Sequence, residues 1–395
     1  MNIKRGPAVE ISLAAIRHNY ELVQGLTHGK KVVATVKADA YGHGAIDVAL
    51  MLEKLGVYCL GVAYAPEAIE LRKGGIRAPI LVYFDNITAE DIIKYNLTPI
   101  VYGAGAADIL SAEALRQGRQ IDIHVDIDTG MGRVGFLYDR ESEAIRALSR
   151  LKGVRVAGFM SHFSEADLKD RTFAELQLER FLRLKSEIEG LFTEAIWHMA
   201  NSAAVMSFPE SHLDAVRPGL ILYGADALEP DYKRPKAAAF RPAMTVKARL
   251  LHIRRVPPGR SISYGRTFVT ARESLVGVVA AGYADGYPRA LSNKAHVLVN
   301  GQFAPIIGRI CMDVAMVDLT DCANLNGIRE NCEGLATPGI EGLATPCVEV
   351  LLIGRQGGKE ITASEVAAWA GTISYEILIS LGRANERVHV DEDGL

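Results

Sequence analysis

The chain has 395 residues, of which 49% are hydrophobic and 23% are charged. This length allows two domains and a large core, and the composition is that of an ordinary globular protein. The 44 basic and 47 acidic residues leave a net charge of -3, which argues against nucleic acid or a membrane surface as a partner.

Targeting and redox features point to a cytoplasmic protein. The charged N-terminal residues are followed by no apolar segment of signal-peptide length, and no later run approaches a membrane span. The five cysteines are odd in number and include no Cys-x-x-Cys pair. We therefore expect neither a disulfide framework nor a zinc site, and we predict no metal.

Helix-like and strand-like segments alternate through the first part of the chain. Residues 11–23 predict a helix with Ser12 as its N-cap. Amphipathic stretches, the longest at residues 171–191, separate most of the apolar runs that follow. Eight such runs predict a closed parallel (β/α)8 barrel of the TIM type: residues 32–37, 59–64, 79–84, 98–102, 121–127, 154–162, 195–201 and 216–223.

An open Rossmann-type sheet is the alternative to a barrel. Residues 103–108 read Gly-Ala-Gly-Ala-Ala-Asp, but they lack the third glycine of a dinucleotide fingerprint and follow three earlier units. Residues 354–360 likewise lack the spacing of a phosphate loop. Neither segment favours nucleotide binding, so the barrel remains the prediction.

Polar side chains fall where the predicted barrel strands end, which is where a barrel enzyme carries its catalytic groups. Lys37 ends the first run, and its amine can condense with an aldehyde if the surroundings lower its pKa. The other candidates follow or end later runs: Arg133, His162, Asn201, Ser202 and, within the eighth run, Arg217. We expect one rim to gather these groups.

The second part of the chain predicts a mainly antiparallel β domain. A polar, proline-containing segment at residues 226–242 resembles a linker, so we assign residues 1–240 to the barrel and 241–395 to the second domain, which the first ~10 residues could join. Strand-like runs lack long intervening helices, and Asn300-Gly301 predicts a hairpin. These runs lie at residues 244–253, 275–282, 297–310, 315–319 and 348–353.

Two further features lie in the C-terminal part of the sequence. A helix is predicted over residues 363–381, with Thr362 as its cap. Before it, the segment Glu333-Gly-Leu-Ala-Thr-Pro-Gly-Ile is followed by a second Glu341-Gly-Leu-Ala-Thr-Pro. We interpret this duplication at residues 333–346 as an expanded surface loop and assign it no chemistry.

Several motifs together make the chain resemble the alanine racemase family over nearly its whole length. The motifs are Val-Lys-Ala-Asp-Ala-Tyr-Gly-His-Gly from Val36, Asp-Thr-Gly-Met-Gly-Arg-Val-Gly from Asp128, Arg-Pro-Gly-Leu-Ile-Leu-Tyr-Gly from Arg217, Ser-Tyr-Gly-Arg-Thr from Ser263, Gly-Tyr-Ala-Asp-Gly-Tyr from Gly282, Gly-Arg-Ile-Cys-Met-Asp from Gly308 and Thr-Ile-Ser-Tyr-Glu from Thr372. The resemblance implies a homodimer that uses pyridoxal 5'-phosphate, with each active site built from both subunits. It also implies a role in supplying D-alanine for peptidoglycan.

The resemblance assigns two opposed bases. Lys37 corresponds to the lysine that holds the cofactor and then serves the D face of the substrate carbon. Tyr264 from the partner subunit corresponds to the base on the L face. Since a free tyrosine has a pKa of about 10, Tyr264 needs a lowered pKa to act near neutrality. In the family this tyrosine connects through a histidine, here His162, to Arg217.

The remaining site residues are also implied by the resemblance. Arg217 would face the pyridine nitrogen, and because a guanidinium keeps its proton, that nitrogen should stay unprotonated and transamination should be suppressed. The residues that match the phosphate-binding set are Tyr41, Ser202, Gly219, Leu220 and Tyr375, with Asn201 beside them. Arg133 would hold the substrate carboxylate. Met312 from the partner would contact the substrate, and Tyr283 would line the entrance.

Asp126 departs from the common pattern. Many family members carry a carbamylated lysine seven residues before the arginine equivalent to Arg133, and this chain has Asp126 there. An aspartate supplies negative charge without the modification, although its side chain is much shorter. We predict that Asp126 pairs with Arg133 directly or through water, and that activity does not depend on bicarbonate.

Other functions remain open at this stage. A racemase of another small or broad range of amino acids shares the motifs. A pyridoxal-phosphate-dependent decarboxylase generally pairs the pyridine nitrogen with an acid and lacks the Ser-Tyr-Gly motif. A non-catalytic carrier of the cofactor is a third possibility, but such barrels are usually single-domain proteins.

Overall fold

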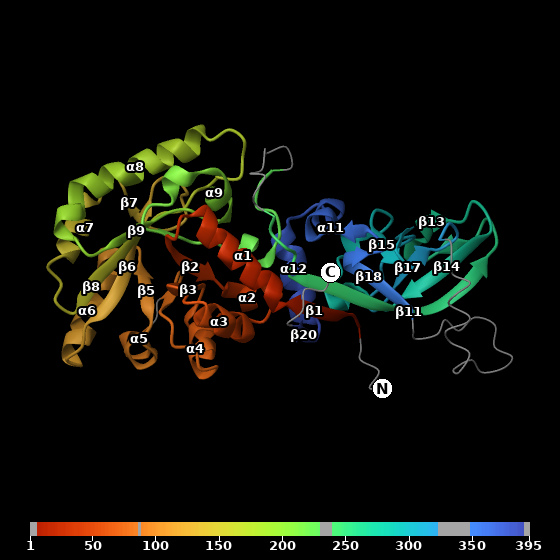
Figure 1. The fold of residues 1–395 in the computed structure, drawn as a ribbon, viewed down its shortest axis with the longest axis horizontal. Coiled ribbons are helices and arrows are strands. Elements are labelled where there is room, and N and C mark those ends of the chain that lie inside the picture. The colour runs from red at the N-terminus through yellow and green to blue at the C-terminus, as the bar shows by residue number, and fades with distance from the viewer. Residues whose placement is uncertain (1–5, 86–87, 230–238, 323–347, 391–395) are drawn as a thin grey trace. The chain divides into compact units, whose positions relative to one another are not determined.

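The structure is a computed structural model that describes residues 6–85, 88–229, 239–322 and 348–390. The chain forms two compact units (Figure 1). The barrel unit comprises residues 16–40 and 45–241, and the β unit comprises the residues before 16, residues 41–44 and those from 242 on. Within the described ranges, no helix is both long and apolar enough to cross a membrane.

Eight parallel strands form the barrel unit's core in the order β5-β4-β3-β2-β10-β9-β8-β6, and β5 also pairs with β6, which closes the ring. This confirms the predicted parallel barrel. A further short strand, β7 (Phe136–Leu137), pairs with β6 outside the ring. The ring strands are β2 (Lys31–Thr35), β3 (Cys59–Val62), β4 (Ile80–Val82), β5 (Thr98–Val101), β6 (Ile121–Asp128), β8 (Val154–Met160), β9 (Ile196–His198) and β10 (Ala215–Val216).

Helices connect the barrel strands, and the longer ones bury one apolar face. α8 is typical, since its buried Phe181 meets Trp197 of β9 with ring centroids 5.2 Å apart. The helices are α1 (Leu13–Leu26), α2 (Lys37–Gly42), α3 (Ala45–Lys54), α4 (Ala65–Lys73), α5 (Ala89–Tyr95), α6 (Ala104–Arg116), α7 (Ser142–Leu148), α8 (Thr172–Ile188) and α9 (Ser202–Ser207), with the short helices η1 (Glu189–Leu191), η2 (Pro209–Ser211) and η3 (Leu220–Tyr223).

The start of α1 and the end of the barrel show where the predictions hold and fail. Ser12 accepts a hydrogen bond from the amide of Ala15 at 3.0 Å, which confirms the predicted cap, although the helix begins at Leu13. The eighth run was predicted as one strand over residues 216–223, and this was wrong. β10 ends at Val216, because Pro218 has no amide hydrogen to continue the ladder and η3 follows.

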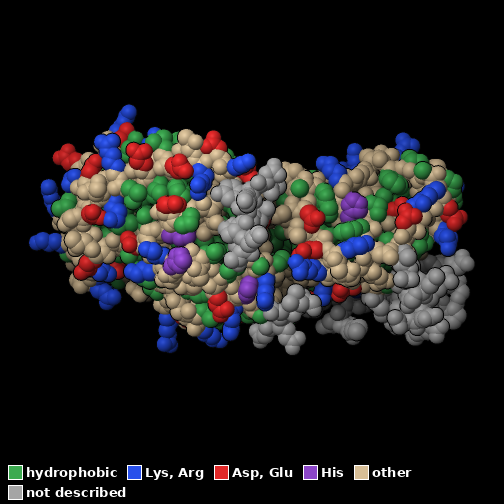
Figure 2. Space-filling view, turned by 45° about the horizontal axis from the view of Figure 1, so that its top comes forward, with side chains coloured by type: hydrophobic (Ala, Val, Ile, Leu, Met, Phe, Trp, Pro, Cys, Tyr) green, Lys and Arg blue, Asp and Glu red, His purple; other side chains and the backbone are tan. Residues whose placement is uncertain are grey.

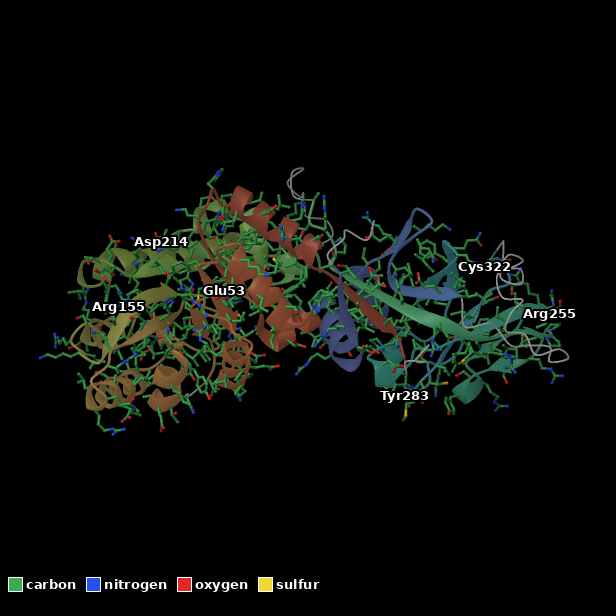
Figure 3. The ribbon with its side chains drawn as sticks, turned by 60° about the horizontal axis from the view of Figure 1, so that its bottom comes forward. Glu53, Arg155, Asp214, Arg255, Tyr283 and Cys322 are labelled. Carbon is green, nitrogen blue, oxygen red and sulfur yellow. The ribbon has the colours of Figure 1, made fainter. Side chains whose placement is uncertain are left out.

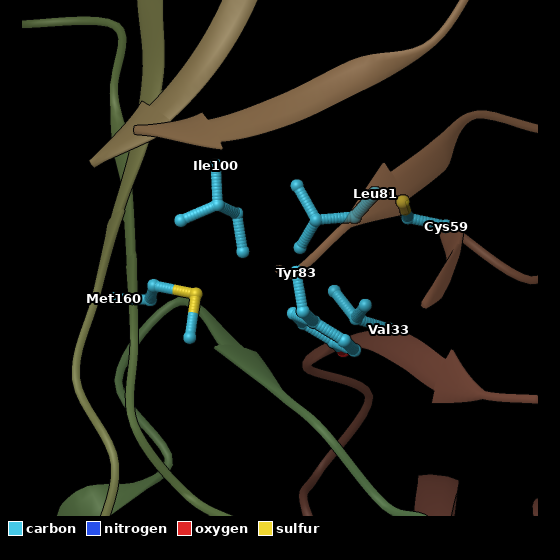
Figure 4. Packing of buried hydrophobic residues seen from close by; sticks show 6 residues of the cluster. All are labelled: Val33, Cys59, Leu81, Tyr83, Ile100 and Met160. Carbon is cyan, nitrogen blue, oxygen red and sulfur yellow. The ribbon is translucent and has the colours of Figure 1, made fainter. Parts of the chain in front are cut away.

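Apolar side chains fill the barrel interior next to the site. Val33, Cys59, Leu81, Tyr83, Ile100 and Met160 converge between the strands and are all buried (Figure 4). Burial of each large side chain in this way contributes about 1.5–3 kcal/mol to the stability of the folded state. Burial also raises the pKa of the Cys59 thiol to about 12, so this cysteine belongs to the packing and not to the chemistry.

Polar contacts tie together the N-terminal ends of the barrel strands. The Asp214 carboxylate accepts from the amide of Trp197 at 2.8 Å. Arg155, labelled in Figure 3, lies near the start of β8. It pairs with Asp122 near the start of β6 at 2.7 Å. In barrel enzymes this end serves stability, whereas the chemistry lies at the opposite end.

The β unit is mainly antiparallel, as predicted. Its sheet has the order β16-β15-β18-β11-β1-β20, while β14 pairs with β11 and β17, and β19 pairs with β18. The pairing of β1 with β20 is parallel. The strands are β1 (Ala8–Ser12), β11 (Met244–Val256), β14 (Ser274–Val279), β15 (His296–Val299), β16 (Gln302–Pro305), β17 (Ala315–Asp318), β18 (Glu349–Gln356), β19 (Lys359–Ile361) and β20 (Arg387–Val390), with β12 (Ser261–Ile262) and β13 (Phe268–Val269) as a separate pair.

Turn residues set the boundaries inside the β unit. Asn300 and Gly301 have φ of 48° and 72° and join β15 to β16, which confirms the predicted hairpin. The helix predicted over residues 363–381 is instead two helices, α11 (Ala363–Ala370) and α12 (Ser374–Ala384), because Gly371 ends the first with a φ of 74°. Thr362 caps α11 as predicted. The duplicated segment at residues 333–346 lies outside the described residues.

Charged side chains of both signs are interspersed over the face shown in Figure 2. This distribution fits the nearly balanced composition of the chain. It gives the visible face no extended field of one sign of the kind that steers nucleic acid.

Candidate active site

Lys37 begins α2 two residues after the C-terminal end of β2, where the preceding backbone is held by neighbouring strands. The amide of Val36 donates to the carbonyl of Gly61 at 2.8 Å, and the amide of Thr35 donates to the carbonyl of Pro218 at 2.9 Å. The side chain of Lys37 is half-buried, and its Nζ lies 5.9 Å from the ring centroid of Phe84. The run predicted over residues 32–37 is therefore strand only as far as Thr35, and Lys37 follows closely after the carboxyl end of that strand.

The surroundings of Lys37 favour a neutral amine. Burial lowers the pKa of Lys37, and the positive charges of Arg133 and Arg217 lower it further, while Glu67 opposes them. Arg133 is exposed and holds its guanidinium carbon 4.9 Å from the same Phe84 ring. A lysine whose pKa is lowered in this way can act as a nucleophile and as a base.

The turn that follows Lys37 is left-handed. The residues 38–41 have φ of 53°, 58°, 52° and 55°, and Gly42 has a φ of 84°. A left-handed conformation costs a non-glycine residue about 1–2 kcal/mol, so this segment stores strain directly after the lysine. Such strain persists only where surrounding contacts determine the backbone.

Two carboxylates hold the first part of this turn. Glu67 accepts from the amide of Ala38 at 2.7 Å and, through its other oxygen, from the amide of Ala63 at 2.7 Å. Asp39 accepts from the amide of Ala45 at 2.7 Å. These contacts fix the backbone on either side of Lys37 to the ends of neighbouring elements.

Two glycines fix the other end of the turn within the β unit. A Cβ on Gly382 of α12 would lie 2.0 Å from the carbonyl oxygen of Gly42, and a Cβ on Gly42 would lie 2.5 Å from that of Leu378. Only glycine allows this approach. It places the ring of Tyr41 5.6 Å from the ring of Tyr375, so these two predicted phosphate ligands lie together.

Arg217 is buried directly after β10, where neutral acceptors surround it. Its Nη1 donates to Nδ1 of His198 at 2.7 Å and to the carbonyl of the same residue at 2.9 Å. Its Nη2 donates to the carbonyl of Ser161 at 2.5 Å and lies 3.3 Å from Nδ1 of His162 and from the carbonyl of Met199. The predicted link between Arg217 and His162 is present.

His162 stays neutral in this site. Burial lowers its pKa well below the ordinary value, and the charges of Arg217, Arg133 and Lys37 add to the effect. A neutral imidazole can accept a hydrogen bond from the arginine through one nitrogen while the other carries the proton.

Ser202 and the loop after β10 form a group of small donors. The Ser202 hydroxyl accepts from the amide of Gly219 at 2.8 Å and lies 3.5 Å from the amide of Ile221. Asn201 caps α9 by accepting from the amide of Ala204 at 3.0 Å. A hydroxyl beside several backbone amides suits a phosphate group, so this donor set fits pyridoxal phosphate together with the lysine.

Asp126 lies in the barrel wall on β6 and is 4% exposed. Burial raises its pKa to about 7, although the charges of Arg217 and Arg133 oppose the rise. Among the described residues, no ion pair joins Asp126 to Arg133 within 4.0 Å. The predicted pairing through water stays a prediction.

Three predicted site residues lie on neighbouring loops of the β unit. Tyr264 on η4 (Tyr264–Arg266), Tyr283 on η5 (Tyr283–Asp285) and Met312 are 68%, 44% and 52% exposed (Figure 3 labels Tyr283). The amide of Tyr283 donates to the carbonyl of Cys311 at 3.2 Å, which ties two of these loops together.

Sequence reasoning missed several residues of the site. Phe84 carries no chemical group that a motif search would notice. Glu67 could have been found, since it follows Tyr64 at the spacing of a capping box. His198 and His124 are polar residues within apolar strand runs, a pattern that indicates an inward-facing polar group.

The fold and the site define a class of enzymes built from a barrel and a β domain. In this class a lysine follows the first strand of the barrel, and here its pKa is lowered. The chain belongs to the alanine racemase family. Models of the alanine racemase N-terminal and C-terminal domains match residues 11–227 and 243–389. This confirms the family resemblance predicted from the motifs.

Relatives agree with this assignment over the full chain. The alanine racemase of Thermodesulfovibrio yellowstonii is 42% identical over 388 residues, which cover 97% of this chain and 98% of that protein. The alanine racemase structure from a D-cycloserine-producing Streptomyces lavendulae has a TM-score of 0.87 at 33% identity, covering 98% of both chains. The biosynthetic alanine racemase of Pseudomonas aeruginosa has a TM-score of 0.81 at 33% identity, covering 98% of this chain and all (100%) of that one.

Proposed function

We propose that this protein interconverts L-alanine and D-alanine with pyridoxal 5'-phosphate as its cofactor, and that it acts as a homodimer. The observation that carries the proposal is Lys37. This lysine stands at a rigid strand end beside two arginines, and its pKa is lowered by burial and by their charges. The family membership gives the substrate class.

Residues that match the family's cofactor-binding set would hold the cofactor. Lys37 would bind its aldehyde, Ser202 and the backbone of Gly219 and Leu220 would bind its phosphate, and Tyr41 and Tyr375 would add two hydroxyls. Asn201 would support this group as the cap of α9. When bound, pyridoxal phosphate withdraws electrons from the substrate and makes its Cα–H bond acidic enough to break.

Inversion of the substrate carbon needs a proton acceptor on each face. Lys37 would serve the D face, because its lowered pKa favours the neutral amine. Tyr264 of the partner subunit would serve the L face. Its 68% exposure in a single chain supports a role toward another subunit, since a large aromatic group is usually covered.

Arg217 would keep the pyridine nitrogen from gaining a proton. A guanidinium donates hydrogen bonds and never accepts them, and the acceptors around Arg217 are neutral imidazoles and carbonyls. Burial lowers the pKa of Arg217 and the charges of Tyr83 and Asp126 oppose this shift, but a guanidinium keeps its proton in proteins. A ring nitrogen that faces it would remain an acceptor.

Arg133 would bind the substrate carboxylate. Its guanidinium is exposed and lies against Phe84. Met312 of the partner would limit the substrate to a small side chain, and Tyr283 would line the entrance. Asp126 would act on Arg133 through its negative charge, which it carries above its pKa of about 7.

A racemisation assay across small and basic amino acids tests the proposal. Rapid formation of D-alanine from L-alanine, abolished in Lys37→Ala and strongly reduced in Tyr264→Phe, is the expected result. Ethylamine as the product would show a decarboxylase. A protein that binds pyridoxal phosphate but exchanges no Cα proton in deuterated water would be a carrier, and a preference for another amino acid would change the substrate.

A further inference from the structure

His124 is a buried imidazole that the proposed mechanism leaves without a role. It stands on β6 with 5% of its surface exposed, and its side chain faces the barrel interior next to His198 of β9. The two ring centroids are 5.0 Å apart. A buried polar ring inside a barrel is costly unless its nitrogens are hydrogen-bonded, so these contacts are informative.

The three side chains Arg217, His198 and His124 form one continuous chain of hydrogen bonds. Nη1 of Arg217 lies 2.7 Å from Nδ1 of His198, and Nε2 of His198 lies 2.8 Å from Nδ1 of His124. This series of hydrogen bonds therefore runs from Arg217, which follows β10, through His198 on β9 to His124 on β6.

The direction of donation along this chain is fixed at one end. A guanidinium can only donate, so Nδ1 of His198 must carry a lone pair and its proton must be on Nε2. That Nε2–H then donates to Nδ1 of His124, which must also carry a lone pair. Burial and the charge of Arg217 lower the pKa of both imidazoles, to about 3 for His124, so both rings are neutral near pH 7.

The backbone of β8 is shaped to admit the His124 ring. The pairing of β6 with β8 runs from Ile123 opposite Val156 to His124 opposite Gly158, so one residue of β8 is bulged out between them. A Cβ on Gly158 would lie 2.5 Å from Cε1 of His124. A bulge and a glycine at the same point are devices that re-aim a side chain.

From this geometry we propose that His124 is a positioning residue: its Nδ1 holds His198 in the tautomer that accepts from Arg217 and so fixes the direction of the Arg217 guanidinium. The proposal rests on the function proposed above, which assigns Arg217 to the pyridine nitrogen. Without the His124 acceptor, the Nε2 proton of His198 would be buried without a hydrogen bond, which weakens the preference for this tautomer. The alternative tautomer carries its proton on Nδ1, which would oppose the arginine and turn the guanidinium away.

Neutron diffraction from the deuterated full-length protein tests the tautomers directly, and it requires neither cofactor nor activity. Deuterons on Nε2 of His198 and of His124, with none on either Nδ1, are the expected result. A deuteron on Nδ1 of either ring would overturn the proposal, because the chain would then run differently.

A pair of variants tests the consequence for catalysis. His124→Asn keeps an acceptor oxygen near the position of Nδ1, whereas His124→Leu has a similar volume and no acceptor. We expect His124→Leu to lower kcat roughly tenfold, as one lost buried hydrogen bond would, with KM for alanine little changed. His124→Asn should recover most of the loss. Equal kcat in the two variants would overturn the proposal.

His212 supplies the control for loss of a buried imidazole in general. It is buried in the barrel unit and lies 3.4 Å from the carbonyl of Ala204. The Asn and Leu variants at His212 should differ in melting temperature but not in kcat. A kcat difference there as large as at His124 would show a general packing effect and overturn the proposal. A wild-type protein that shows the expected deuterons but does not racemise alanine would refute only the proposed function.

Discussion

Arg133 and Lys37 place their cationic groups against the same aromatic ring, at 4.9 Å and 5.9 Å from the centroid of Phe84. Two like charges that share a partly buried site each disfavour the charged form of the other. Because arginine keeps its proton, the lysine bears the effect. The arrangement therefore helps to lower the pKa of Lys37.

The first prediction concerns the pKa of Lys37. Removing the charge in Arg133→Gln should raise the lysine pKa, because Arg133 now lowers it. As the solution is acidified, the amine of the variant would therefore gain its proton at a higher pH than the amine of the wild type. The pH dependence of covalent pyridoxal phosphate incorporation into the full-length apo-protein measures this, and its midpoint should move to higher pH. Arg119→Gln, which alters an exposed arginine outside the site, should leave the midpoint in place.

The second prediction concerns Asp126 and stability. Its pKa of about 7 lies above the unfolded value of 3.8, so the folded state binds the extra proton between these pH values and loses stability as the pH rises through that window. At pH 8, the free energy of unfolding of Asp126→Asn, measured with urea, should therefore exceed that of the wild type by ~2–4 kcal/mol. This difference should shrink toward pH 4. A difference that stays constant from pH 4 to 8 would contradict the assignment.

The third prediction concerns bicarbonate. If Asp126 takes the place of a carbamylated lysine, the racemase should keep its full activity in buffer freed of carbon dioxide. Assays with and without added bicarbonate should give the same kcat and KM. A clear activation by bicarbonate would show that another group in this chain is modified.

The fourth prediction concerns the glycine contact behind the left-handed turn. Gly382→Ala would press a methyl group onto the carbonyl of Gly42, where only 2.0 Å is available, and should destabilise the protein by about 3 kcal/mol or more. Gly25→Ala in α1 meets no atom within 4 Å and should stabilise it by roughly 0.5–1 kcal/mol. Urea unfolding compares the two. Equal effects would mean that the close approach is not needed.

Much of the architecture could be predicted because it follows from local patterns. Eight apolar runs separated by amphipathic stretches predict a closed barrel, and Asn300-Gly301 predicts a hairpin, since each pattern has one favoured backbone solution. The division at Gly371 was readable in the same way but was overlooked. The early end of β10 follows from Pro218, which the predicted strand of residues 216–223 should not have included.

The geometry around Lys37 could not be predicted from local patterns. Ala38 and Tyr41 have no preference for positive φ, so the left-handed turn is imposed by distant partners such as Glu67 and Gly382. Phe84 likewise gains its place beside Lys37 only through the pairing of the strands. Long-range contacts of this kind leave no periodic trace in one sequence.

The central claim is that Lys37 of one subunit and Tyr264 of its partner act on the same substrate carbon. Its most direct test is a heterodimer of Lys37→Ala and Tyr264→Phe subunits, co-expressed with different affinity tags and purified through both. One of the two sites in such a dimer regains both bases, so we predict about half of the wild-type kcat, far above either homodimer. A heterodimer as inactive as the two parent variants would contradict the account.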